Sequence, residues 1–555
     1  MLGGTAGCRL AYRLADAPTK PSVLLLETGG NPTGDTISSP YDRYTPAFTR
    51  PDLDHGYSTV PQKELNNRII PYLRGKGLGG SSILNFMIYL YGSKEDYDRW
   101  ASLVGDESWD WEHTKEIFKS IENYHSSASA TYSEYADPVS DEHGHEGSVD
   151  ISLPTRLERG VDIFLDAGHE FGYPRNLDHN SGNPIGLGVF PATYYRGTRT
   201  TSATAHLSKV PSNLAVMTDS TATKIHFEGK RATAVELENR QIATARKEVI
   251  LAAGAFDSPK LLLLSGVGPV SQIESHNIPV VHELQGVGKN LQEHPIVFLN
   301  VEVGSALSEK YAFEADAAAM KEARETWLKD KTGPLSHHNG TVWGGFLKLP
   351  ELEKTEEYKE LDADVRVYME KPTVPAFETA LSAPMLPPGH ELPAGHAYLT
   401  DVVFLMNPQS RGQIALASSD PKDAPLIDIA FLDHPFDRRA MLLAIRESMN
   451  FFENSALAKY FKGYILGPKS TSDEDINTFI REQVGPVWHA NGTVMMGKAD
   501  ELDSCVDTKF RVHGLQNLRV ADLSVCPLTA NNHPQSLAYL IGEKAARSII
   551  EDWKL

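Results

Sequence analysis

The beginning of this chain constrains its fold more than any other stretch. Residues 2–7 (LGGTAG) are followed by apolar residues at helical spacing over 6–14 and by the strand-like residues 23–26 (VLLL), which end at Glu27. Glycines in such a turn let the backbone approach a pyrophosphate, whose charge the N-terminus of the following helix stabilises. An acidic residue about 20 positions further on is typical of a ribose-binding carboxylate. The stretch therefore predicts a dinucleotide-binding βαβ unit.

We expect this unit to lack its first strand. Gly4 and Gly7 fit the second and third glycines of the motif, and Leu2 stands where the first would be. Only Met1 precedes it, although about five apolar strand residues are usual. A missing strand would leave two open edges in the middle of the sheet. Taken alone, the stretch is also compatible with a glycine-rich tail before an ordinary helix and strand.

A second glycine-rich segment follows at residues 74–85 (RGKGLGGSSILN). Its glycines and serines predict a loop whose N–H groups converge on a phosphate or on the edge of a flavin. The helical pattern from Ser82 predicts a helix N-terminus that points at the same anion. A flexible surface loop is the alternative, but the apolar run at 86–90 (FMIYL) indicates burial.

Three motifs resemble those of one enzyme family. Residues 75–100 are similar to the first signature of the glucose-methanol-choline (GMC) flavin oxidoreductases, and residues 254–269 are similar to the second. Residues 286–294 (GVGKNLQEH) resemble the family's VGxNLQDH element, with Glu293 where Asp is usual. The resemblance implies an α/β plus α+β fold with FAD as the cofactor. In that fold, a Rossmann-like FAD-binding domain is interleaved with a sheet-and-helix substrate domain.

The length of the chain agrees with two domains, because 555 residues exceed what one hydrophobic core usually supports. The FAD-binding domain is expected at 1–150, 201–300 and 498–555. The substrate-binding domain is expected at 151–200 and 301–497.

Local patterns predict further elements. Alternating apolar residues over 214–227 indicate strands of a small sheet, and residues 248–254 indicate a buried parallel strand that runs into a turn. A charged helix is expected at 316–327 and a strand at 397–405. The proline-rich residues 384–393 are a candidate rim or lid loop, although simple rigidity is the more common role of such prolines.

Two histidines are the candidate catalytic residues. His489 lies within residues 485–493 (GPVWHANGT), and His533 lies where residues 531–536 (NNHPQS) open the last predicted helix. By resemblance, His489 matches the catalytic histidine of the family and His533 matches its partner, which is His, Asn or Arg in other members. Imidazole titrates near neutral pH, so His489 is expected to take the hydroxyl proton of an alcohol while flavin N5 accepts the hydride. His533 would hold the hydroxyl and share its developing charge.

The resemblance also implies the contacts of the cofactor. Ala222 matches a residue whose backbone contacts adenine, Asp522 matches a residue near the ribityl and pyrophosphate groups, and the start of the last helix borders the flavin ring. The predicted cofactor-binding residues are Gly4, Thr5, Ala6, Gly7, Glu27, Gly79, Gly80, Ser81, Asn85, Ala222, Asp522, Asn532, Pro534 and Gln535.

The predicted reaction is the oxidation of a primary alcohol, aryl or small, with oxygen or another acceptor reoxidising the flavin. Trp343, Phe346 and Phe404 are candidates for an aryl pocket, although core packing is the more common role of each. Formate oxidation is disfavoured, because members that perform it carry arginine at the position of His533. Two alternatives remain open: a lyase or cyclase that keeps FAD for structure, and a chain made inactive by the missing strand.

Charge and composition exclude other classes. The net charge of -20 and the pI near 5.5 argue against a surface for nucleic acid or anionic membranes. No apolar run reaches the ~18 residues of a membrane span. Three cysteines, Cys8, Cys505 and Cys526, predict neither a disulfide framework nor a metal site. An intracellular location is favoured, with secretion left open because a signal peptide would precede the missing strand.

Overall fold

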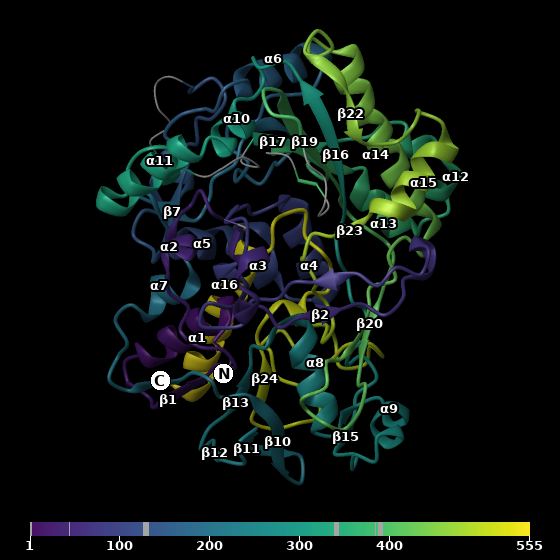
Figure 1. Ribbon diagram of the computed structural model, residues 1–555. Coiled ribbons are helices and arrows are strands. Elements are labelled where there is room, and N and C mark those ends of the chain that lie inside the picture. Colours follow the sequence, from purple (N-terminus) through teal and green to yellow (C-terminus); the bar gives the residue numbers. More distant parts are fainter. Residues whose placement is uncertain (1–2, 44, 126–131, 338–342, 383–384, 387–391) are drawn as a thin grey trace.

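The computed structural model describes residues 3–43, 45–125, 132–337, 343–382, 385–386 and 392–555. The predictions for Met1, for Leu2 and for most of the proline-rich loop at 384–393 therefore fall outside the described residues. Figure 1 shows two parts, with short parallel strands and the first and last helices at the bottom and a large sheet at the top. This arrangement confirms the predicted α/β plus α+β fold class.

The lower part contains the predicted nucleotide-binding elements. Helix α1 (Thr5–Ala15) leads into strand β1 (Val23–Leu26), which pairs in parallel with β9 (Leu214–Met217). Strand β13 (Val249–Leu251) pairs in parallel with β24 (Leu518–Val520). Within the part of the chain that the structure describes, no strand pairing joins these two pairs. The parallel sheet therefore consists of two separate halves.

The first and last helices pack against each other. Helix α16 (Gln535–Trp553) lies beside α1 at the lower left of Figure 1. Its buried Glu543 carboxylate binds Arg9 at 3.0 Å and Arg13 at 2.9 Å. These charge-assisted hydrogen bonds join segments from opposite ends of the sequence into one unit.

The small sheet differs from its prediction in one strand. The antiparallel sheet contains β10 (Ala222–Glu228), β11 (Arg231–Leu237) and β12 (Ile242–Thr244). Strand β9 exists as expected but pairs with β1. Alternating apolar residues specify a strand and its buried face, and they leave its pairing partner undetermined. The prediction that all of 214–227 belongs to one small sheet is therefore wrong for β9.

The helix predicted from Ser82 is also wrong. Residues Gly80–Ile83 form a single 3-10 turn. The Ser82 hydroxyl donates to the carbonyl of Gly79 at 2.6 Å and accepts from the N–H of Ser202 at 2.9 Å, so it ties down a loop in place of starting a helix. The apolar run that follows, at residues 86–90, is largely buried, as predicted. Its backbone forms hydrogen bonds with the backbone of residues 191–193.

The upper part is built on a seven-stranded antiparallel sheet in the order β22–β16–β19–β18–β17–β6, with β23 also on β16. Its two central strands are buried on both faces because helix α14 (Pro435–Asn454) packs on one face and the lower part lies under the other. The strands are β6 (Gly186–Val189), β16 (Pro295–Val303), β17 (Trp343–Leu347), β18 (Phe377–Ser382), β19 (Ala397–Leu405), β22 (Phe461–Leu466) and β23 (Gly485–Pro486).

The strand predicted at 397–405 is β19, and the charged helix is α11 (Ala317–Asp330), capped by Asp316. The exact domain division stays a prediction.

The remaining helices are α2 (Asp35–Ser38), α3 (Thr45–Thr49), α4 (Lys94–Val104), α5 (Trp111–Ile121), α6 (Val161–Phe171), α7 (Ser202–Leu207), α8 (Gly254–Leu264), α9 (Val270–Ser275), α10 (Lys310–Ala315), α12 (Glu356–Lys359), α13 (Ala363–Met369) and α15 (Asp473–Gln483). The short strands are β2 (Tyr57–Ser58), β3 (Pro71–Tyr72), β4 (Glu122–His125), β5 (Val149–Ser152), β7 (Tyr194–Tyr195), β8 (Thr198–Arg199), β14 (Val267–Gly268), β15 (His282–Glu283), β20 (Gln413–Ala415) and β21 (Leu426–Asp428).

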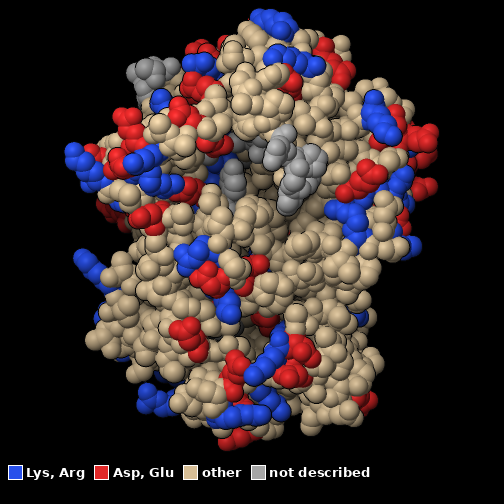
Figure 2. Space-filling model, in the orientation of Figure 1, with Lys and Arg blue, Asp and Glu red and all other residues tan. Residues whose placement is uncertain are grey.

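The surface shows both signs of charge. On the face in Figure 2, acidic and basic side chains are interspersed. Among the described residues, no helix has the length and apolar character needed to cross a membrane. The same residues contain no group of three or more His, Cys, Asp or Glu side chains that could hold a metal ion.

Candidate active site

Two joined cavities lie between the two parts of the molecule. The first, here called the cofactor cavity, lies over the start of α1, the end of β1 and the start of α8. Among the predicted cofactor residues, it is lined by Gly4, Thr5, Ala6, Glu27, Gly80, Ser81, Ala222 and Asp522. The second, here called the substrate cavity, lies under the large sheet. The predicted site residues that line this cavity alone are His489, His533, Asn85, Pro534 and Gln535.

The glycine turns of the cofactor cavity fit a pyrophosphate. Gly4 caps α1 without any side-chain hydrogen bond, so the N–H groups of the first turn are left for a ligand. Gly80 has a φ of +54°, and a Cβ on it would lie 2.7 Å from the Cα of Gly4. Two backbone turns therefore meet with no room for side chains, which is the cradle that a dinucleotide needs.

Two buried carboxylates hold the backbone in place around the cofactor cavity. Oε1 of Glu27 accepts the N–H groups of Gly29 and Gly77, each at 2.9 Å. Burial raises the pKa of Glu27, and these hydrogen bonds act in the opposite direction. Asp522 accepts from the N–H of Gly254 at 3.0 Å and from the hydroxyl of Ser258 at 2.6 Å, so it holds the start of α8 against the cavity.

Three predicted cofactor residues lie outside both cavities. Gly7 is buried inside α1, and the N–H of Gly79 donates to the carbonyl of Gly3 at 2.8 Å. The side-chain amide of Asn532 donates to the carbonyl of Tyr91 at 3.0 Å. Contact of these three residues with the cofactor therefore stays a prediction, and their contacts in the structure are with the surrounding backbone.

The cofactor cavity also contains residues that were not predicted from the sequence. The rings of His55 and Tyr57 stack at 5.3 Å, and the Tyr57 hydroxyl donates to Asp257 at 2.7 Å. Arg74 also lines the cavity. The position of Arg74 at the start of the glycine-rich segment could have identified it as a site residue from the sequence. His55 and Tyr57 belong to no motif.

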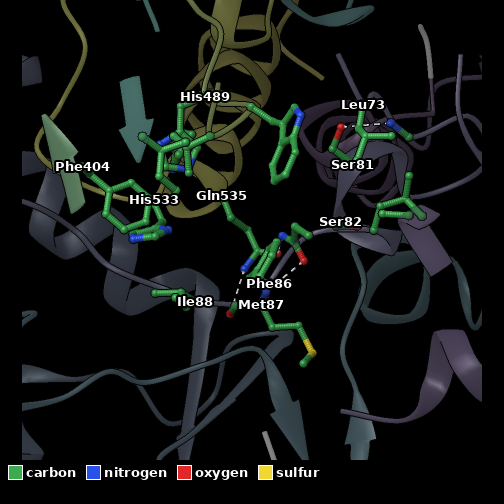
Figure 3. Close-up of a pocket in the computed structure, with 18 of the residues that line it drawn as sticks. Leu73, Ser81, Ser82, Phe86, Met87, Ile88, Phe404, His489, His533 and Gln535 are labelled. Atoms are coloured by element: carbon green, nitrogen blue, oxygen red, sulfur yellow. Dashed lines mark hydrogen bonds between the residues drawn. The ribbon is translucent and has the colours of Figure 1, made fainter. Parts of the chain in front are cut away.

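The substrate cavity is mainly apolar. Its walls include Phe86, Met87, Phe298, Phe404 and Trp488, and Figure 3 shows His489 and His533 close together beside Phe404. Of the three aromatic residues named for an aryl pocket, Phe404 lines this cavity, whereas Phe346 is in the core and Trp343 lines a different cavity. The residues that line both joined cavities are Thr5, Arg74, Gly75, Ser81, Leu523 and Ala538.

His489 is held in the form of a base. Its Nδ1 lies 3.0 Å from Nδ1 of His294, and its backbone N–H donates to Oε1 of Glu293 at 2.8 Å. Burial, followed by the nearby His533, His294 and Arg74, holds the pKa of His489 well below its usual value. The neutral imidazole therefore keeps a lone pair at neutral pH.

His533 faces the same space from the loop before α16. Its ring centroid lies 5.1 Å from that of His489, at an angle of 78°. Its Nε2 lies 2.9 and 3.2 Å from the two carboxylate oxygens of Glu378, which projects from β18. The two predicted catalytic histidines are thus brought together, with a carboxylate that the sequence analysis did not identify.

A hydrogen-bonded network supports the backbone around His489. The Tyr72 hydroxyl donates to Glu293 and accepts from the N–H of Ala490 at 3.1 Å and from Arg74 at 2.9 Å. Arg74 also donates to the carbonyl of Trp488 at 2.7 Å. Burial raises the pKa of Glu293 to about 7. The acidic residue in the third motif therefore positions the loop that carries His489.

Helix α16 directs its N-terminus at the substrate cavity. Its cap, Pro534, provides no side-chain hydrogen bond, so the N–H groups of the first turn remain available to an electron-rich ring. The amide of Asn85 donates to Oε1 of Gln535 at 2.6 Å, which joins the second glycine-rich segment to this helix.

The fold and the two joined cavities define an FAD-dependent oxidoreductase. Residues 2–296 and 408–542 match the N- and C-terminal models of the GMC oxidoreductases, and this chain belongs to that family. The alcohol dehydrogenase (acceptor) of Pseudomonas putida is 33% identical, over 99% of this chain and 94% of its own. The patulin synthase of Penicillium expansum is 31% identical, over 99% and 90%. The formate oxidase structure from Aspergillus oryzae superposes with a TM-score of 0.89 at 26% identity, over 100% and 98%. This chain is therefore an oxidoreductase of the type that acts on the CH–OH group of alcohols, as the motifs predicted.

Proposed function

We propose that this enzyme oxidises a primary alcohol, aromatic or small, to the aldehyde. The observation that carries the proposal is the neutral, buried His489 in an apolar cavity that opens into the FAD cavity. FAD supplies the hydride acceptor when it is bound. Oxygen or another acceptor then receives the electrons.

His489 takes the hydroxyl proton. Its Nδ1 is bonded to His294, so Nε2 is the ring nitrogen left to act as the base. His533 holds the hydroxyl oxygen from the other side, which places the alcohol between two imidazoles. After the reaction, the proton on His489 passes to solvent or to the reduced acceptor.

The cavity favours neutral substrates. Aromatic walls from Phe86, Phe404 and Trp488 match an aryl or apolar alcohol. The Glu378 carboxylate in the wall disfavours an anion such as formate, in agreement with the absence of an arginine at position 533. The name of the Pseudomonas putida relative, an alcohol dehydrogenase, supports the same substrate class.

The test is anaerobic bleaching of the flavin by a panel of alcohols that includes benzyl alcohol. The wild type is expected to bleach, and His489→Ala is expected to keep its FAD and lose bleaching by about a hundredfold or more. His169→Asn, on the exposed face of α6, is the matched control and should behave as wild type. A flavin that stays oxidised during turnover of the true substrate would identify a lyase or cyclase. Failure to bind FAD would identify an inactive chain.

A further inference from the structure

The last part of the first motif, residues 94–100, lines neither cavity but contains a buried carboxylate. Asp96 is the third residue of α4 and is 1% exposed. Burial raises the pKa of Asp96 to about 6, so the side chain is ionised at neutral pH. A buried anion is stable only when donors face it. The donors around Asp96 therefore indicate what it holds in place.

Four donors converge on this carboxylate, and two of them belong to Asn531. Oδ2 of Asp96 accepts the backbone N–H of Asn531 at 2.7 Å and that of Ser93 at 3.2 Å. Oδ1 accepts the side-chain amide of Asn531 at 2.6 Å and the hydroxyl of Tyr368. A carboxylate offers about four lone-pair sites, so all of them are used. Asp96 therefore binds Asn531 through its backbone and its side chain together.

Asn531 also binds the upper part of the molecule. Its Oδ1 accepts the side-chain amide of Asn407, two residues after β19, at 2.8 Å. Its own amide donates to the hydroxyl of Tyr368 on α13 at 2.8 Å. The amide of Asn407 also donates to the carbonyl of Pro375, two residues before β18, at 2.8 Å. This buried cluster therefore joins α4 to the two strands that form the wall of the substrate cavity beside His533.

His533 follows Asn531 by two residues and faces that wall. Its ring centroid lies 5.6 Å from that of Phe404 on β19, at an angle of 74°. Only Asn532 separates His533 from Asn531, and it is 1% exposed. A Cβ on Gly92 would lie 3.2 Å from the Cβ of Asn532, so the chain is closely packed there. A shift of Asn531 would therefore move the ring of His533.

Building on the proposed alcohol oxidation, we infer that Asp96 is a positioning residue that fixes the place of His533 against the wall of the substrate cavity. Asp96 lines neither cavity and acts on the alcohol only through Asn531 and His533. A displacement of about 1 Å in a group that orients the substrate can slow a reaction about a hundredfold. The loss should fall on the chemical step, because the alcohol still enters the same apolar cavity.

Strand β19 offers a matched control. Asp401 is also 1% exposed, and burial raises its pKa to about 6 as well. It accepts the hydroxyls of Thr379, at 2.5 Å, and of Ser448 on α14, and it lines neither cavity. Asp401→Asn removes an equally buried carboxylate and leaves the loop of His533 untouched. Its flavin reduction should match the wild type, and a loss as large as that of Asp96→Asn would overturn the inference.

The experiment is a double-mutant cycle on anaerobic flavin reduction by benzyl alcohol in the FAD-loaded chain. Asp96→Asn keeps the shape of the side chain and replaces an acceptor oxygen by a donor. Its maximal rate should fall about ten- to hundredfold, with apparent affinity changed about twofold or less. In His533→Ala, the same substitution should change the rate about twofold or less. An unchanged rate of Asp96→Asn, or an equal loss in both backgrounds, would overturn the inference.

A second variant applies if Asp96→Asn does not hold FAD. Tyr368→Phe removes one donor from the carboxylate and one acceptor from Asn531. Its rate should fall about five- to tenfold, and only while His533 is present. Tyr173→Phe, which also removes a hydroxyl that donates to a carboxylate, on Glu447 at 2.8 Å, should behave as wild type. Equal rates in the two tyrosine variants would refute the role of Asp96.

Crystal structures test the place of His533 without any alcohol. The ring of His533 should be displaced in the FAD-loaded Asp96 or Tyr368 variant and unmoved in Asp401→Asn. A wild type that no alcohol reduces would refute the proposed substrate, and a displaced ring would still support the role of Asp96. An unmoved ring in the Asp96 or Tyr368 variant would refute that role.

Discussion

Nδ1 of His489 lies 3.0 Å from Nδ1 of His294. A hydrogen bond needs one donor and one acceptor, and Nε2 of His489 must carry the lone pair if it is to take a proton. His489 therefore donates and His294 accepts. Nε2 of His294 then carries a hydrogen that is buried without a partner among the described residues. Burial of His294 lowers its pKa to about 3, so it stays a neutral acceptor.

His294→Leu should slow flavin reduction while FAD remains bound. Loss of the acceptor leaves the ring of His489 free to rotate. The rate of flavin reduction should therefore fall about tenfold, which corresponds to the free energy of about one hydrogen bond. Anaerobic stopped-flow measures it. His179→Leu is the control, because it also removes a buried imidazole with one unpaired nitrogen, and His179 lines neither cavity. Equal rates in the two variants would contradict the role given to His294.

Glu293 should make stability fall as pH rises. Burial raises the pKa of Glu293 from 4.5 to about 7, so the folded protein holds a proton that the unfolded chain releases. Its stabilising contribution is complete below pH 4.5 and is lost as pH rises through about 7. Glu293→Gln has no titratable group at this position. Between pH 4.5 and 7 its free energy of unfolding should therefore fall by up to about 3 kcal/mol less than that of the wild type. Urea unfolding of both proteins across this pH range tests the prediction, which parallel stability curves would refute.

Gly80→Ala should weaken FAD binding as well as stability. The added Cβ would lie 2.7 Å from the Cα of Gly4, in the cradle of the pyrophosphate. Gly229→Ala is the control, because its φ of +58° is similar and nothing lies within 4 Å of the new Cβ. In both variants, backbone strain should lower the free energy of unfolding by about 1 kcal/mol or more. Only Gly80→Ala should also lose flavin absorbance, and equal FAD contents would contradict the cradle.

Glu543→Ala should destabilise the protein by about 3–5 kcal/mol, because it leaves Arg9 buried without its counter-charge. The exposed fractions of the Arg9 and Glu543 side chains are 6% and 1%. Glu356→Ala, which breaks the exposed pair with Lys359, should cost about 0.5 kcal/mol or less. Chemical unfolding of the two variants compares these values, and a similar cost for both would show that burial of the pair is unimportant.

Motifs and periodicity predicted much of the fold, and they singled out the two histidines that the structure brings together. The glycine turns, α1 and α16 follow from local patterns, and the two histidines follow from their motif contexts. The partners of these histidines were not predictable in this way. His294 stands 195 residues from His489, and Glu378 stands 155 residues from His533, so folding alone brings them together.

Two errors have a similar physical origin. The hydroxyl of Ser82 bonds to Gly79 and Ser202, so tertiary contacts override the helical pattern that follows it. Strand β9 has the alternation of a small sheet and pairs with β1. In both cases the local pattern specified which residues are apolar, and contacts with distant residues decided the backbone conformation or the pairing partner.

The packing of α1 on α16 affects how the protein is made in the cell. Arg9 and Glu543 are separated by 534 residues, so helix α1 waits for its partner while these residues are synthesised. At about 5–20 residues per second this wait is on the order of half a minute to two minutes. During that time the apolar face formed by Leu10, Ala11 and Leu14 has no cover from α16. The cofactor cavity is likewise incomplete during that time, because Asp522, Leu523 and Ala538 in its lining are made hundreds of residues after the first glycine turn.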